Sequence, residues 1–145
     1  VFMERADEAA VLALAEKVGL AAGDLNKYPS ELSGGMAKRV AFLRLMLCGC
    51  DLALLDEPFV GLDRDLREVL AAMLVEKIER EGWACLLVTH DRFEAARLSR
   101  EIMLLAPKGM GVEKTIFLPE PLSSRDSAYE EAAVAREFGG VKYYE

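Results

Sequence analysis

Two adjacent carboxylates follow a short apolar run near the middle of the chain. The run is Leu52-Ala53-Leu54-Leu55, and Asp56 and Glu57 come directly after it. A continuous apolar run suits a strand covered on both faces, and α/β sheets place ligands at the carboxyl ends of their strands. Because successive strand residues point to opposite faces, we expect one carboxylate to serve a metal ion and the other a water molecule. The alternative is an acidic turn in solvent.

A Ser-Gly-Gly turn lies upstream of these acids, within Leu32-Ser33-Gly34-Gly35-Met36. Ser33 can cap a helix, and Gly34 and Gly35 let a ligand approach the backbone closely. The free amides at a helix start favour an anion. Taken alone, this segment is better explained as an ordinary turn before a helix.

A second turn, Gly61-Leu62-Asp63, precedes a long predicted helix. Asp63 has two interpretations, because it either caps that helix or takes part in a ligand site. The segment alone does not separate them.

The only histidine of the chain, His90, lies in Val88-Thr89-His90-Asp91, just after a second apolar run. A lone histidine is usually structural or exposed. This one follows a strand end of the same kind as the one before Asp56 and Glu57, so we expect the three side chains to share a cleft.

Helices and strands alternate around these residues. We expect helices over 7–18, 36–48, 64–81, 92–98 and 127–138, and strands over 52–55, 84–89, 101–106 and 112–118. The helix over 36–48 is apolar nearly all round, so we expect it to be buried. The alternation predicts an α/β layered fold.

Composition narrows the class of protein. With 145 residues, 52% of them apolar, the chain is able to form a packed domain, and no apolar run is long enough to span a membrane. A net charge of −7 argues against a nucleic-acid surface. The three cysteines fit a reducing compartment, and Cys48-x-Cys50 is better explained by core packing than by metal binding. Because the chain begins with Val1 and not Met, we expect it to come from a longer protein.

Together the segments LSGGM, LALLDEP, GLD and VTHD, in this order and spacing, resemble the ATP-binding subunits of ABC transporters over about residues 28–106. The resemblance implies an α/β fold: a partial P-loop NTPase (ABC-type) fold with a mostly parallel sheet. Residues 1–50 would end the helical subdomain and carry the signature helix. Residues 51–118 would form the Walker B to switch-histidine core, and 119–145 a C-terminal extension.

Other short segments of the sequence resemble particular branches of this family. Asp56-Glu57-Pro58-Phe59, Glu94-Ala95 and the Leu-Pro-Glu-Pro segment at 118–121 resemble importers of nitrate, sulfonate and taurine. The Phe-Val-Gly-Leu-Asp stretch at 59–63 also resembles ATPases of lipid-trafficking systems. DNA-repair ATPases share the signature helix, but long heptad coiled coils flank it there, and none occurs in this sequence.

The resemblance also implies cofactors and partners, namely ATP, Mg²⁺, a second ATP-binding subunit arranged head to tail, and transmembrane permease subunits. It places the protein in the cytoplasm, peripheral on the inner face of the cell membrane. Ser33, Gly34 and Gly35 would contact the γ-phosphate of ATP held by the opposite subunit. Asp63 would belong to a loop that crosses the dimer interface.

Three residues would act in hydrolysis by the same resemblance. Asp56 would help to hold Mg²⁺ through water, and Glu57 would orient or deprotonate the attacking water. His90 would contact the γ-phosphate. Positioning and charge stabilisation carry most of the catalysis in phosphoryl transfer, so these roles need no covalent nucleophile.

One element of the family pattern does not occur in the 145 residues: the phosphate-binding loop G-x-x-x-x-G-K-S/T. We therefore expect this polypeptide alone to bind MgATP very weakly and not to turn it over. We also expect exposed strand edges or apolar faces where the strand before that loop would lie. A non-catalytic half of a split ATPase stays open as an alternative.

Overall fold

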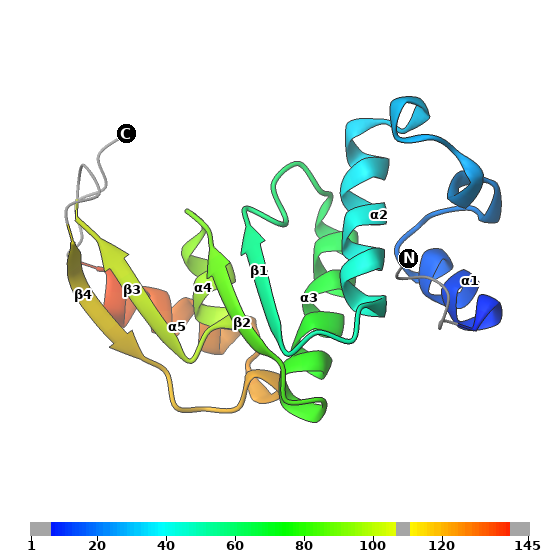
Figure 1. Cartoon of the computed structure of the whole chain (residues 1–145). Coiled ribbons are helices and arrows are strands. Elements are labelled where there is room, and N and C mark those ends of the chain that lie inside the picture. Colours follow the sequence, from blue (N-terminus) through cyan, green and yellow to red (C-terminus); the bar gives the residue numbers. More distant parts are fainter. Residues whose placement is uncertain (1–6, 107–110, 140–145) are drawn as a thin grey trace. The chain divides into compact units, whose positions relative to one another are not determined.

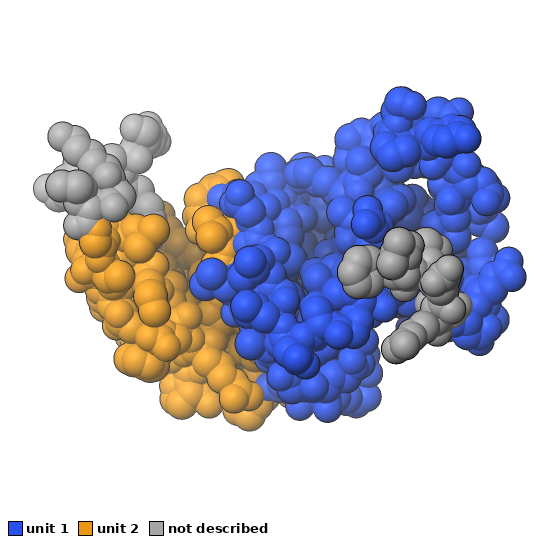
Figure 2. Space-filling view, in the orientation of Figure 1, with its two compact units in different colours: residues 1–86 blue, residues 87–145 orange. Residues whose placement is uncertain are grey.

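The computed structural model describes residues 7–106 and 111–139, which form two compact units (Figure 2). Residues 1–86 make up the first unit and residues 87–145 the second. No helix within the described ranges is long and apolar enough to cross a membrane.

The first unit contains three helices, two 3₁₀ turns and a short strand (Figure 1). Its elements are α1 (Glu8–Lys17), the 3₁₀ turns Ala22–Asn26 and Pro29–Glu31, α2 (Gly34–Leu47), β1 (Leu52–Asp56) and α3 (Arg64–Arg80). Strand β2 (Ala84–Val88) follows α3 and pairs with β1 in a parallel, two-stranded sheet. The α/β prediction is confirmed, and β1, α3 and β2 form the strand–helix–strand unit that it requires.

Side-chain caps explain why the predicted helix bounds hold. The carboxylate of Asp7 accepts from the Ala9 amide and starts α1. Asp63 starts α3 in the same way through the Leu66 amide. Gly19 follows α1 with a φ of 69°, a conformation that glycine adopts without steric cost and that ends a helix.

Helix α2 differs from the prediction in two respects. It begins at Gly34, two residues before the expected start. The expectation of a buried helix was wrong, because only Phe42, Leu43 and Met46 are fully buried. The helix packs on α1 and α3, and polar side chains such as Lys38 and Arg44 lie on its exposed side.

The strands of the parallel pair bury one face and expose the other. Ala53 of β1 is buried, whereas its neighbours Leu52 and Leu54 are 55% and 68% exposed. Leu86 of β2 is 61% exposed. Full coverage of β1 was therefore a wrong prediction, and the expected apolar exposure is confirmed.

The second unit packs two helices on an antiparallel hairpin (Figure 1). Its elements are α4 (Arg92–Leu98), β3 (Glu101–Leu105), β4 (Val112–Phe117), the 3₁₀ turn Leu122–Ser124 and α5 (Ser127–Phe138). In the sheet register Glu101 faces Phe117 and Ile102 faces Ile116. The core of this unit joins side chains from both helices and both strands: Ala95, Ala96, Ile102, Ile116, Leu118, Ala133 and Phe138.

A buried arginine fastens this unit together. Arg125 is 7% exposed, and its guanidinium donates to the backbone carbonyls of four residues: Ala96, Ser99, Leu118 and Glu120. It also lies over the Tyr129 ring, 5.3 Å from the ring centre. A buried charge is tolerated where its donors are satisfied, and here they tie the end of α4 to the segment after β4.

Candidate functional site

Ser33 caps the N-terminus of α2. Its hydroxyl oxygen accepts from the Met36 amide at 3.2 Å, and its carbonyl accepts from the Ala37 amide at 2.8 Å. The amides of Gly34 and Gly35 have no acceptor within the helix, as for any first turn. A Cβ built on either glycine would meet no atom within 4 Å, so the space beside this backbone is open. The Ser33 hydroxyl hydrogen is still able to donate, and the ordinary cap is compatible with an anion site.

The same helix holds the turn that follows β1. The Lys38 ammonium donates to the carbonyl of Val60. One turn further along α2, the Phe42 ring packs on Phe59 with ring centres 6.4 Å apart, and Phe59 is fully buried. Within the first unit, α2 thus links the Ser33 cap to the turn that carries Glu57.

Glu57 has an uncommon backbone conformation. Its φ is 46°, and among the described residues it is the one non-glycine residue with a positive φ. Pro58 follows it, and a residue before proline normally prefers extended backbone. Left-handed backbone in such a residue costs of the order of 1–3 kcal/mol and concentrates at functional sites.

Asp56 ends β1 and differs from Glu57 in exposure. The Asp56 side chain is exposed, whereas Glu57 is half-buried. Among the described residues, no three His, Cys, Asp or Glu side chains gather closely enough to hold a metal ion. A single exposed carboxylate nevertheless fits Mg²⁺, which keeps several waters and takes further oxygens from phosphates.

A nucleotide fits the described residues in part. The first amides of α2 suit phosphate oxygens, because they combine free N–H groups with the positive end of the helix dipole. The 145 residues contain no loop with a lysine of the phosphate-binding pattern. The residues present therefore fit one side of a phosphate site.

Asp63 caps α3, and its carboxylate accepts from the Leu66 amide at 2.9 Å. Gly61 precedes it with a φ of 78°, and a Cβ built there would lie 3.9 Å from the Lys38 ammonium. The capping interpretation is confirmed. A role of Asp63 at a subunit interface stays a prediction.

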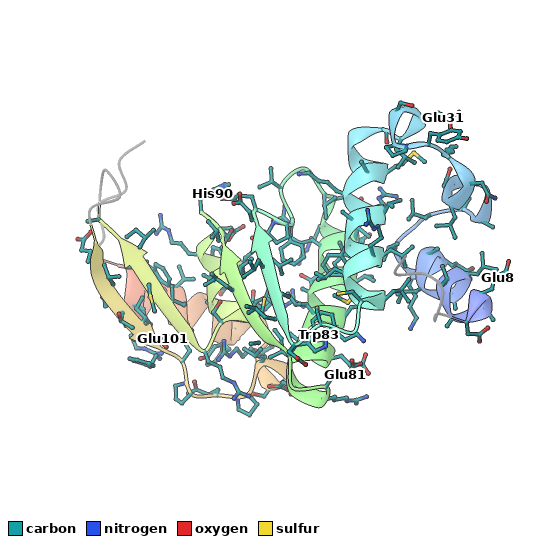
Figure 3. All side chains as sticks on the ribbon, in the orientation of Figure 1. Glu8, Glu31, Glu81, Trp83, His90 and Glu101 are labelled. Atoms are coloured by element: carbon teal, nitrogen blue, oxygen red, sulfur yellow. The ribbon has the colours of Figure 1, made fainter. Side chains whose placement is uncertain are left out.

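His90 lies in the second unit, directly after β2 (Figure 3). Its neighbours hold the loop. The Thr89 hydroxyl donates to the Glu94 carboxylate at 2.7 Å and accepts from the Asp91 amide at 3.1 Å. Asp91 caps α4 by accepting from the amides of Phe93 and Glu94. The exposed imidazole thus stands on a fixed loop.

The predicted site residues divide between the units. Residues 1–86 contain Ser33, Gly34, Gly35, Asp56, Glu57 and Asp63, whereas His90 lies in residues 87–145. Within the first unit α2 connects the serine-glycine turn with the strand-end acids. A cleft shared by His90 and these acids stays a prediction.

Sequence reasoning assigned no role to the residues that hold these segments in place. They are Lys38 and Phe59 in the first unit and Thr89 and Glu94 in the second. For Lys38 the sequence did offer a signal: it lies little more than one helical turn after Gly34, so it belongs to the same end of the predicted helix as the serine-glycine turn. Glu94 carried no such signal, because its burial (8% exposed) and its hydrogen bond from Thr89 are seen only in the structure.

Comparison with known proteins supplies independent evidence. The family described as ABC transporter matches residues 3–60. An aliphatic sulfonates import ATP-binding protein of Burkholderia lata is 39% identical over 129 residues, which are 89% of this chain and 46% of that protein. The corresponding proteins of Rhodococcus jostii and Streptomyces avermitilis are 43% and 44% identical, and the matches cover 82% and 79% of this chain and 48% and 45% of those proteins. The chain spans about half the length of the curated relatives it matches.

Solved structures agree with the sequence matches. A dimeric ATP-binding cassette in a post-hydrolysis state, bound to ADP and phosphate, matches with a TM-score of 0.65 and 30% identity. The match covers 75% of this chain and 46% of that one. Motif order, fold and sequence similarity agree, and we conclude that the chain belongs to the ABC transporter family of ATP-binding proteins.

Proposed function

We propose that this chain forms part of the ATP-binding subunit of an ABC importer and that Glu57 handles the water that attacks ATP. The observation that carries the proposal is the left-handed backbone of Glu57 directly after the strand-end Asp56. A strained, half-buried carboxylate needs surroundings that hold it in place. The Lys38–Val60 hydrogen bond and the Phe42–Phe59 contact meet that need.

Each of these residues has a proposed role that fits its chemistry. Ser33 and the amides of Gly34 and Gly35 bind phosphate oxygens of a nucleotide held by a second, head-to-tail subunit. Asp56 would help to hold Mg²⁺ through water. MgATP, when bound, supplies the phosphoryl group and the charge on which these side chains act.

Glu57 and His90 act at the reacting end of the nucleotide. Glu57 orients the water and accepts its proton, while the His90 imidazole donates to a γ-phosphate oxygen. Asp63, at the start of α3, lies on a loop that faces the second subunit. These roles assign charge stabilisation and positioning to residues of this chain.

The relatives support a proposal for the class of transported substrate. Several sulfonate-import proteins are about 40% identical over most of this chain, which supports a small oxyanion of the sulfonate, nitrate or taurine type. The subunit would work on the cytoplasmic face of the membrane, bound to permease subunits.

A second candidate is half of a split ATPase whose phosphate-binding loop belongs to another polypeptide. Leu54 of β1 and Leu86 of β2 are exposed apolar side chains of the kind that another segment normally covers, and in this candidate the other polypeptide supplies that segment. Mixing the two halves as separate chains and measuring phosphate release distinguishes this candidate from a continuous subunit.

The proposed function is tested in a fusion that supplies the phosphate-binding loop. The first half of the Burkholderia lata relative is joined ahead of this chain, and phosphate release is measured with MgATP. We expect turnover, and we expect Glu57→Gln to lower it about 100-fold or more while nucleotide binding persists. Glu113→Gln, at an exposed position of β4, is the matched control and should leave turnover unchanged. A fusion that binds MgATP but turns it over equally well with Glu57→Gln contradicts the proposal.

A further inference from the structure

Two cysteines at the end of α2 lie beside each other. The sulfur atoms of Cys48 and Cys50 are 2.9 Å apart, and both cysteines are free thiols. Both residues are half-buried, so the pair lies at the edge of the core. The third cysteine, Cys85, is also half-buried and lies on β2.

The backbone around the pair is fixed on both sides and adaptable between them. Cys48 ends α2, and its amide donates to the carbonyls of Arg44 and Leu45 at 3.0 and 3.1 Å. On the other side, the Asp51 carbonyl accepts from the Ala84 amide at 2.9 Å. Gly49 lies between the two thiols, and a Cβ built on it would meet no atom within 4 Å. Its conformational freedom allows the two sulfur atoms to approach bonding distance while the helix end stays in place.

We propose that Cys48 and Cys50 form a redox-active dithiol that a low-molecular-weight disulfide oxidises to an intramolecular disulfide. The thiolate of Cys48 attacks one sulfur of the small disulfide and releases the first small thiolate, leaving a mixed disulfide on Cys48. The thiolate of Cys50 then attacks the Cys48 sulfur, forms the new S–S bond and releases the second small thiolate. Two electrons pass from the protein to the small disulfide, and two protons from the cysteines end on the two released thiols.

The environment of Cys50 supports this order of the two steps. The hydrogen bond with the Cys48 thiol, followed by burial, raises the pKa of Cys50 above its ordinary value. A thiol that ionises less readily is the poorer initial nucleophile, so Cys50 takes the second, intramolecular step, where its proximity compensates. A disulfide across a single residue closes a small, strained ring, and such disulfides are readily reduced again. The pair is thus suited to reversible oxidation.

Oxidised glutathione is the probe that tests the proposal on the whole 145-residue chain. After incubation with oxidised glutathione and before alkylation, we expect the protein mass to be about 2 Da lower than that of the reduced chain. Alkylation should then label one of the three cysteines instead of three, and a digest should contain a peptide in which Cys48 and Cys50 are linked. Excess dithiothreitol should restore all three. Cys85→Ser is the matched control, and its mass should also fall by about 2 Da on oxidation, because Cys48 and Cys50 are both present.

The single variants separate the two steps. Cys50→Ser should accumulate a glutathione adduct on Cys48, whereas the unsubstituted chain passes rapidly through that adduct. Cys48→Ser should lose the internal disulfide and form an adduct on Cys50 more slowly. Equal alkylation of all three cysteines in the unsubstituted chain, or stable glutathione adducts without an internal disulfide, would overturn the proposal.

Discussion

Replacing Glu57 tests whether its backbone is strained in the way the structure shows. At a φ of 46°, a side chain with a Cβ costs about 1–2 kcal/mol relative to glycine. Glycine also makes the unfolded chain more flexible, which costs about 0.4–1 kcal/mol of stability. The difference predicts that Glu57→Gly is more stable than Glu57→Ala by about 0.5–1 kcal/mol.

A matched pair of variants at Glu76 gives the opposite sign. Glu76 is exposed in the middle of α3 and pairs with Arg80, a contact that both substitutions remove. In a helix interior, glycine is about 1 kcal/mol less favourable than alanine. Glu76→Gly is therefore expected to be less stable than Glu76→Ala, the reverse of the order at Glu57.

Urea unfolding followed by tryptophan fluorescence measures both pairs. Trp83 is the only tryptophan of the chain, is 7% exposed, and lies in the same unit as Glu57. With a urea dependence of about 1–2 kcal/mol per molar, the expected difference moves the unfolding midpoint by about 0.3–1 M. If Glu57→Ala proves as stable as Glu57→Gly, while the Glu76 pair shows the usual order, the reasoning about strain fails.

Three further variants test other contacts. Arg125→Met leaves four backbone carbonyls without their donor and should destabilise the second unit by about 3–5 kcal/mol, seen in thermal unfolding by circular dichroism. Lys38→Met removes the hydrogen bond to the Val60 carbonyl and should lower the stability by about 1 kcal/mol, measured by Trp83 fluorescence. Lys27→Met, directly after the 3₁₀ turn Ala22–Asn26, removes an exposed ion pair with Asp24 and is the comparison, for which we expect a smaller loss. The Tyr129 hydroxyl donates to the Glu120 carboxylate at 2.8 Å and lowers the pKa of that carboxyl. This contact therefore stabilises the fold at pH values above the ordinary pKa of a glutamate, and the stabilisation is lost as the pH falls through the lowered pKa. Tyr129→Phe should flatten the acid limb of a stability–pH curve, and an unchanged limb would contradict this.

Local signals in the sequence predicted the helices well. Asp7 and Asp63 are caps whose side chains start α1 and α3 at the expected positions, and Gly19 ends the first of these helices. Such signals act within one helical turn, which is why they can be read without the fold. The strand ends that carry Asp56 and His90 were found from apolar runs for the same reason.

Features that depend on distant partners were not predictable from local patterns. Leu54 of β1 looked like a residue covered on both sides, and its exposure depends on which segments pack on the sheet. The left-handed backbone of Glu57 results from the turn that Phe59 and Lys38 fasten to α2, and no residue type in the sequence signals it. The 2.9 Å approach of Cys48 and Cys50 likewise depends on the way α2 ends.

We propose that the turn at Ser33 and the strand-end carboxylates Asp56 and Glu57 act as in an ABC ATPase, and the 145 residues contain no loop of the pattern that grips nucleotide phosphates. Calorimetric titration of the 145-residue chain with MgATP tests it most directly. We expect no binding in the micromolar range, because the amides of Gly34 and Gly35 alone offer one side of a site. A micromolar site on the isolated chain would contradict it.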